Sequence, residues 1–135
     1  MDNKRDLMKY RIEQAKECLE LAKTTVNISE KNSVNRSYYC IFHSMRAVLA
    51  LDGFDSKKHS GIISYFRQNY IKTGKFDVNF SAIISSAFDV RGDSDYEDFY
   101  VVSKKQALQQ IENAEMFLNA VEKYIEDLES KSCQD

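Results

Sequence analysis

The chain has 135 residues, of which 43% are hydrophobic and 30% are charged, a size and composition typical of one globular domain. It contains four glycines and no proline, which argues against a β-rich fold because such folds need many tight turns. The formal net charge of −2 argues against a protein that holds nucleic acid mainly by neutralising phosphates, since such proteins carry a large basic excess.

The first helix is predicted over residues 5–25. Its apolar residues recur with the alternating spacing of four and three that turns one helical face toward a core. They are Met8, Ile12, Ala15, Leu19 and Ala22. The polar stretch 27–33 separates this helix from a second one, whose apolar pattern runs from Tyr38 to Leu49. Gly53 is predicted to end the second helix as a left-handed cap.

Two shorter helices and one long helix follow. Ser56 is predicted to cap a third helix that Gly74 stops, and Asp77 to cap a fourth. Residues 92–99 break the helical period. Ser103 and Gln106 form a capping box, after which apolar residues repeat with spacings of four and three. They are Ala107, Ile111, Ala114, Leu118, Val121, Ile125 and Leu128.

These elements predict an all-α fold, an up-and-down helical bundle of four to five helices. No linker, repeat or low-complexity segment divides the chain, so residues 1–135 are predicted to form a single helical domain. The polar residues 130–135 are expected to be a frayed tail.

The cysteines and the N-terminal residues indicate where the protein acts. Cys18, Cys40 and Cys133 are widely spaced and form no CxxC pair, so neither a disulfide framework nor a zinc site is expected. Residues 1–9 are charged, and no run of about 18 apolar residues could span a bilayer. We therefore expect a cytoplasmic protein without a signal peptide or a membrane span.

The second predicted helix carries the main candidate for chemistry. Arg36 and His43 are seven residues apart, and seven steps of about 100° return to nearly the same face, about 10 Å further along the axis. Asn35 and Tyr39 flank the same face of this helix. A histidine that moves protons, beside a guanidinium that holds developing phosphate charge, suits phosphoryl chemistry on RNA. On spacing alone, a lone histidine beside Phe42 is more often a packing residue.

The surrounding segment resembles a known family. The run from Asn35 and Arg36 through Tyr38, Tyr39, Phe42 and His43 is similar to the signature of HEPN domains, small helical bundles found in toxin–antitoxin pairs and defence systems. The resemblance continues downstream to about residue 96. It includes Lys58, His59, Gly61, Phe66, Lys72, Thr73, Gly74, Arg91, Asp95 and Tyr96.

This resemblance implies a bundle that dimerises and brings two copies of the arginine–histidine motif to a shared cleft. Active members of the family are metal-independent endoribonucleases that use the motif for attack by the 2′-hydroxyl. By this resemblance Arg36 would stabilise phosphate charge, His43 would act as general acid or base, and Asn35 would orient one of them. No metal and no cofactor is implied.

Two positions depart from the family pattern. Many active members have asparagine, aspartate or histidine directly after the arginine, where this chain has Ser37, so a supporting role for this residue is in question. Some toxin members carry a tyrosine two residues beyond the histidine that a partner nucleotidyltransferase modifies. This chain has Met45 there, which argues against inactivation through that position.

Two further groups are candidates for supporting roles. Lys57, Lys58 and His59 form a basic cluster at the start of the third helix, where backbone N–H groups favour anions, and would bind substrate; a solvated helix start explains them equally well. Asp95 and Tyr96 could orient Arg36 or His43. The acidic run from Asp93 lacks the glycine and glutamate of a calcium-binding EF-hand loop, so that site is rejected.

Two functional hypotheses follow. The first is a toxin-type or defence-type endoribonuclease, a homodimer with Arg36 and His43 of both chains at the interface and RNA as its substrate. The second is a non-catalytic module that binds a nucleotide or a partner. A nucleotidyltransferase antitoxin would act in trans in either case, because this chain has no motif for that activity. Neither a membrane nor DNA is expected as a partner.

Overall fold

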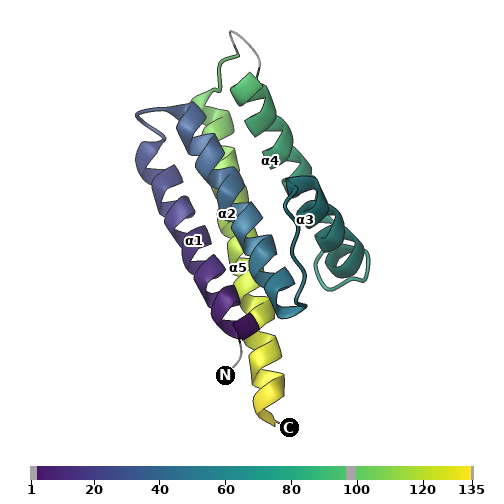
Figure 1. Cartoon of the computed structure of the whole chain (residues 1–135). Coiled ribbons are helices and arrows are strands. Elements are labelled where there is room, and N and C mark those ends of the chain that lie inside the picture. The colour runs from purple at the N-terminus through teal and green to yellow at the C-terminus, as the bar shows by residue number, and fades with distance from the viewer. Residues whose placement is uncertain (1–2, 97–99, 135) are drawn as a thin grey trace.

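The computed structural model describes residues 3–96 and 100–134, and every regular element in these ranges is helical (Figure 1). The elements are α1 (Asn3–Thr25), α2 (Glu30–Leu51), α3 (His59–Phe66), the π-helical turn η1 (Arg67–Ile71), α4 (Asn79–Tyr96) and α5 (Lys104–Gln134). In Figure 1, α1, α2, α4 and α5 run alternately up and down. The predicted all-α, up-and-down bundle is confirmed.

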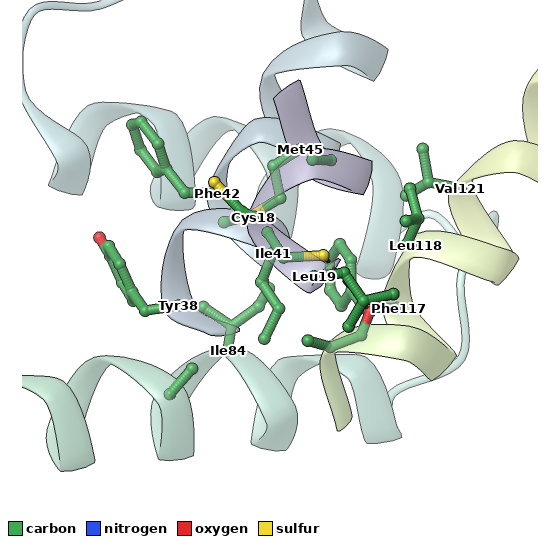
Figure 2. Packing of buried hydrophobic residues seen from close by; sticks show 14 of the residues in the cluster. Cys18, Leu19, Tyr38, Ile41, Phe42, Met45, Ile84, Phe117, Leu118 and Val121 are labelled. Carbon is green, nitrogen blue, oxygen red and sulfur yellow. Dashed lines mark hydrogen bonds between the residues drawn. The ribbon is translucent and has the colours of Figure 1, made fainter. Parts of the chain in front are cut away.

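α2 is the central helix, because it packs against α1, α3, α4 and α5. The five apolar residues predicted for the first helix are all buried. Figure 2 shows Phe117, Leu118 and Val121 of α5 facing α2, with Tyr38 and Phe42 on the far side of α2 from them. The apolar stripe of α5 is buried up to Ile125, whereas Leu128 is 39% exposed. The C-terminal end of α5 projects past the other helices (Figure 1).

Most of the predicted helix ends are present. Ser29 caps α2 by accepting a hydrogen bond from the Asn32 backbone. Gly53 follows α2 with a φ of 72°, in the left-handed region that favours glycine. Asp77 accepts from the Asn79 backbone at the start of α4. The Ser103 hydroxyl accepts from the Gln106 backbone and the Gln106 side chain accepts from Ser103, which confirms the capping box.

The third helix differs from the prediction at its start and in its last turn, whereas Gly74, with a φ of 83°, follows its end as predicted. Ser56 does not cap it: α3 begins at His59, and the Ser56 hydroxyl accepts from the Lys58 backbone in the preceding turn. After Phe66 the helix widens into η1, where the Lys72 backbone N–H donates to the carbonyl of Arg67.

α4 and α5 both extend further than the sequence pattern indicated. The break expected from residue 92 onward is wrong as far as Tyr96, because α4 continues to that residue. Arg91 and Asp95 form an ion pair one turn apart that bridges the expected break. α5 continues to Gln134, through most of the stretch expected to be frayed.

Among the described residues, no helix combines the length and the apolar character that crossing a bilayer requires.

Candidate functional site

The candidate residues lie along one outward strip of α2. We define the α2 strip as Asn35, Arg36, Tyr39, His43 and Arg46. Arg36 is exposed and the other four are half-buried, whereas most residues between them are buried. Because α1 packs on one side of α2 and α3 with α4 on the other, the strip is an accessible surface bordered by three helices.

Arg36 lies at the α1 border of the strip. Its guanidinium is next to the thiol of Cys18 on α1, where burial raises the pKa of that thiol and the arginine acts against the rise. No contact joins Arg36 to His43 among the described residues. The two side chains therefore share the strip, as the spacing predicted, but they do not touch within one chain.

His43 lies between aromatic rings and cations. Its ring centroid is 6.0 Å from those of both Tyr39 and Phe42. Nδ1 is shielded from solvent and has no hydrogen-bond partner, which leaves Nε2 as the nitrogen that can exchange a proton. Burial lowers the pKa of His43, and the positive charges of Arg46 and Arg11 lower it further. His43 is therefore a neutral imidazole near pH 7.

Two arginines, Arg11 and Arg46, lie at the C-terminal end of the strip. Arg11, a buried residue of α1, donates to the carbonyl of Arg46 over 2.9 Å and to the carboxylate of Asp55 over 3.2 Å. Arg46 donates to the same carboxylate over 3.1 Å. Burial acts to raise the pKa of Asp55, but the hydrogen bond from the Ser56 backbone and the charge of Arg46 hold it below its ordinary value. The single carboxylate of Asp55 thus pairs with two arginines, so a net positive charge remains beside His43.

Arg91 of α4 contacts the N-terminal part of the strip. Its guanidinium donates to the Asn35 side chain over 3.2 Å and to the Tyr39 hydroxyl over 3.5 Å, and it pairs with Asp95 over 3.4 Å. Its guanidinium carbon is 4.7 Å from the Tyr38 ring centroid. Asp95, expected to orient Arg36 or His43, contacts Arg91 instead.

An open groove of about 570 Å³ lies beside the strip. It is lined by Phe42, Arg46, Asp55, Ser56, Lys57 and His59. His59 is half-buried and Lys57 is exposed, so both can contact a molecule in the groove. Lys58 is exposed at the N-terminal end of α3. Two members of the predicted basic cluster, Lys57 and His59, therefore line the groove beside the strip.

Three other expected positions have different placements. Ser37 is fully buried and its hydroxyl has no partner among the described residues, so it does not reach the surface of the strip. Met45 is 1% exposed, so the position that carries a modified tyrosine in some toxins is inaccessible here. The side chain of Tyr96 lies outside the described residues.

Sequence reasoning assigned no role to Arg46, Arg91 or Arg11. Arg46 could have been found, because it is three residues after His43 and so on the same helical face. Arg91 was part of the family resemblance, but its contacts with α2 depend on how α4 packs. Arg11 belongs to the first helix, whose apolar stripe gave no sign of a buried cation.

The sequence matches the family model described as HEPN domain over residues 8–124. A UPF0332 protein of Thermotoga maritima is 34% identical to this chain, over 95% of this chain and 98% of its own length. Two proteins of Methanocaldococcus jannaschii are also similar. "Putative toxin MJ0142" is 32% identical over 90% of this chain and 83% of its own length, and "Putative toxin MJ0605" is 31% identical over 87% of each.

Proposed function

The chain belongs to the HEPN domain family, and from that membership we propose that it is a toxin-type endoribonuclease that cuts RNA by attack of a ribose 2′-hydroxyl. The observation that carries the proposal is His43, a neutral and half-exposed imidazole beside Arg46 and Arg11 on an accessible strip. The names of two relatives support the toxin class. We expect it to act in the cytoplasm, where its RNA substrate is found.

The proposed chemistry needs a proton acceptor and a site for negative charge. A neutral His43 can take the proton of the 2′-hydroxyl through Nε2, because Nδ1 is shielded. As the hydroxyl oxygen attacks phosphorus, charge develops on the non-bridging oxygens, and guanidinium groups stabilise such charge with paired N–H donors. Arg36 and Arg46 are the strip residues that present guanidinium groups.

We propose that the complete site forms between two copies of the chain. Within one chain, Arg36 contacts Cys18 of α1 and has no contact with His43 among the described residues. A two-fold dimer that packs strip against strip would bring Arg36 of one copy toward His43 of the other, since the same surface is used twice in such an interface. Asn35 and Tyr39 would be held in place by Arg91, and Lys57, Lys58 and His59 would bind substrate.

The second candidate is a non-catalytic module that binds a nucleotide or a partner protein. The observation that favours it is the cluster formed by the rings of His43, Tyr39 and Phe42, whose centroids are 6.0–6.2 Å apart and which would also suit the stacking of a base. In either case we propose a nucleotidyltransferase encoded separately as the partner that acts in trans. Met45 is not the target of such a partner, because it is buried.

The test is incubation of purified protein with labelled RNA in EDTA. Wild type, Arg36→Ala and His43→Ala are compared with Lys31→Ala, an exposed residue of α2 outside the strip. The nuclease proposal expects cleavage by wild type and Lys31→Ala, and a loss of about 100-fold or more in the two strip variants. Cleavage that is unchanged in both strip variants rules out this site. No cleavage by any form favours the binding module.

A further inference from the structure

A second imidazole borders the aromatic rings that surround His43. His59 begins α3, and its ring centroid is 4.1 Å from that of Phe42 and 5.9 Å from that of Tyr39. These rings are also the neighbours of His43. The two histidines of the chain, which come from different helices, are therefore placed on one aromatic cluster. His59 lines the groove directly, together with Phe42, the ring neighbour of His43.

Tyr38 fixes which nitrogen of His59 is available. The Tyr38 hydroxyl and His59 Nδ1 are 2.8 Å apart, a hydrogen bond between a buried tyrosine and a half-buried histidine. Burial raises the pKa of Tyr38 to about 12, so the hydroxyl keeps its proton. When it donates to Nδ1, the hydrogen of the neutral imidazole is on Nε2. When the ring is protonated, both nitrogens carry hydrogens. In both states Nε2 carries a hydrogen, and the protonated ring is the state that can give this proton to an oxygen.

Cleavage through the 2′-hydroxyl needs two proton transfers at separate places. The attacking oxygen and the departing 5′-oxygen lie on opposite sides of phosphorus in an in-line displacement, so one imidazole does not serve both at once. We propose that His59 is the second proton-transfer residue of the reaction, donating to the 5′-oxygen while His43 removes the proton of the 2′-hydroxyl. This inference rests on the proposed nuclease function.

The step balances with one proton moving at each end. His43 Nε2 gains the 2′-hydroxyl proton as the 2′-oxygen forms its bond to phosphorus. The bond from phosphorus to the 5′-oxygen breaks, and that oxygen takes the Nε2 proton of His59, whose ring is protonated at the start of the step. The products are a 2′,3′-cyclic phosphate and a free 5′-hydroxyl. His43 ends protonated and His59 neutral, and exchange with water restores both.

The surroundings of His43 suit a proton acceptor, and a bound phosphate would suit His59 to the role of donor. Burial lowers the pKa of His43, and the charges of Arg46 and Arg11 lower it further, which favours the neutral ring that accepts a proton. The pKa of His59 is also lowered, first by burial and then by Arg91 and Arg46. His59, however, lines the groove beside Lys57, where a bound phosphate would offset this positive charge. A bound phosphate therefore raises the pKa of His59, so that the ring takes up a proton from water when substrate is present.

The experiment separates the two roles by changing the leaving group. A linkage that wild type cuts in ordinary RNA is remade with sulfur in place of the bridging 5′-oxygen. A thiolate leaves without being protonated, so this substrate needs no general acid. We expect His43→Ala to lose about 100-fold or more on both substrates. We expect His59→Ala to lose about as much on the oxygen substrate and to stay within about threefold of wild type on the sulfur substrate.

Two further variants keep the test independent of folding. His59→Asn removes the titrating group but keeps hydrogen-bonding capacity toward Tyr38, and it should behave as His59→Ala does. Tyr38→Phe keeps the ring but removes the hydroxyl that holds Nδ1, so it should show a smaller loss that sulfur also relieves. Equal losses on both substrates for both His59 variants, or no loss on either, overturn the role of His59 alone. A wild type that cuts neither substrate overturns the nuclease proposal itself.

Discussion

Arg91 of α4 lies over the ring of Tyr38 on α2, with its guanidinium carbon 4.7 Å from the ring centroid. The same guanidinium donates to the Asn35 side chain and pairs with Asp95. One cation therefore connects α4 to the α2 strip and also lies near the hydrogen-bonded pair of Tyr38 and His59. Its charge should influence stability and the titration of His59 together.

Arg91→Met should raise the pKa of His59 and reduce the free energy of unfolding. The pKa rises because a cation that lowers it is removed. Stability falls by about 1–2 kcal/mol because a cation–π contact and a hydrogen bond between helices are lost. NMR titration of His59 and urea unfolding measure the two effects. Arg91→Lys keeps the charge and is the control in which the pKa should stay low. An unchanged His59 titration in Arg91→Met would contradict the influence of the Arg91 charge on the pKa of His59.

Mixing two inactive variants tests whether the site is shared between chains. If Arg36 of one copy works with His43 of the other, an Arg36→Ala chain paired with a His43→Ala chain has one complete site. Random pairing then restores about a quarter of wild-type RNA cleavage, because half of the dimers are mixed and each has one of two sites intact. Cleavage is measured after denaturing and refolding the variants together. Refolding each variant alone is the control, and no recovery would place both residues in one chain's site.

The helices could be predicted because their signals are local. The stripe of α1 and the capping box at Ser103 depend on spacings within a few residues, and both are present. The end of α4 could not be predicted in the same way. Gly92 and the acidic residues after it read as a break, but contacts of Arg91 with Asn35 and Tyr39, far away in the sequence, hold the helix beyond that point.

The candidate site was predictable only in part, for the same reason. Spacing places Arg36 and His43 on one face of α2, and both are on the outward strip. Spacing does not reveal that Arg36 contacts Cys18, or that Tyr38 bonds His59, because these contacts depend on how α1 and α3 pack against α2. The burial of Arg11 could not be predicted either, because this residue interrupts no local pattern.

Gly61→Ala should disturb the groove. A Cβ on Gly61 would overlap the Ser56 hydroxyl oxygen and crowd its Cβ, so the Ser56 side chain or the turn that carries it must shift. We expect a loss of about 1–3 kcal/mol in the free energy of unfolding and slower RNA cleavage, measured by urea unfolding and by the EDTA assay. Adding Ser56→Gly removes the clashing atoms and should recover most of the loss. Persistent loss in the double variant would show that the clash is not the cause.

Gly92→Ala is the matched control for that change. Gly92 is inside α4, and a Cβ there would have nothing within 4 Å. Alanine loses less backbone entropy than glycine in a helix, so this variant should be more stable by about 0.5–1 kcal/mol. Its RNA cleavage should match wild type. A destabilised Gly92→Ala would indicate that α4 does not continue through this residue.

The pH dependence of kcat/KM should show its maximum below the ordinary histidine pKa of 6.5. Both histidines have lowered pKa values. His43 faces Arg46 of α2, Arg11 of α1 and His59 of α3, while His59 faces Arg91 of α4 together with Arg46 and Tyr38 of α2. The rate falls at acidic pH as His43 becomes protonated, and it falls at higher pH as His59 loses its proton.

Variants and a stability control can assign the acidic and alkaline limbs of the kcat/KM profile to the two histidines. His59→Asn should remove the alkaline limb, and the sulfur substrate should do the same with wild type. Unfolding must be followed in parallel, because the unfolded chain binds protons at both histidines more readily than the folded chain. Stability from these groups is therefore present above about pH 6.5 and is lost as pH falls through their lower folded pKa values. A kcat/KM that keeps rising to about pH 8 in the folded protein would contradict the assignment of His59 as the acid.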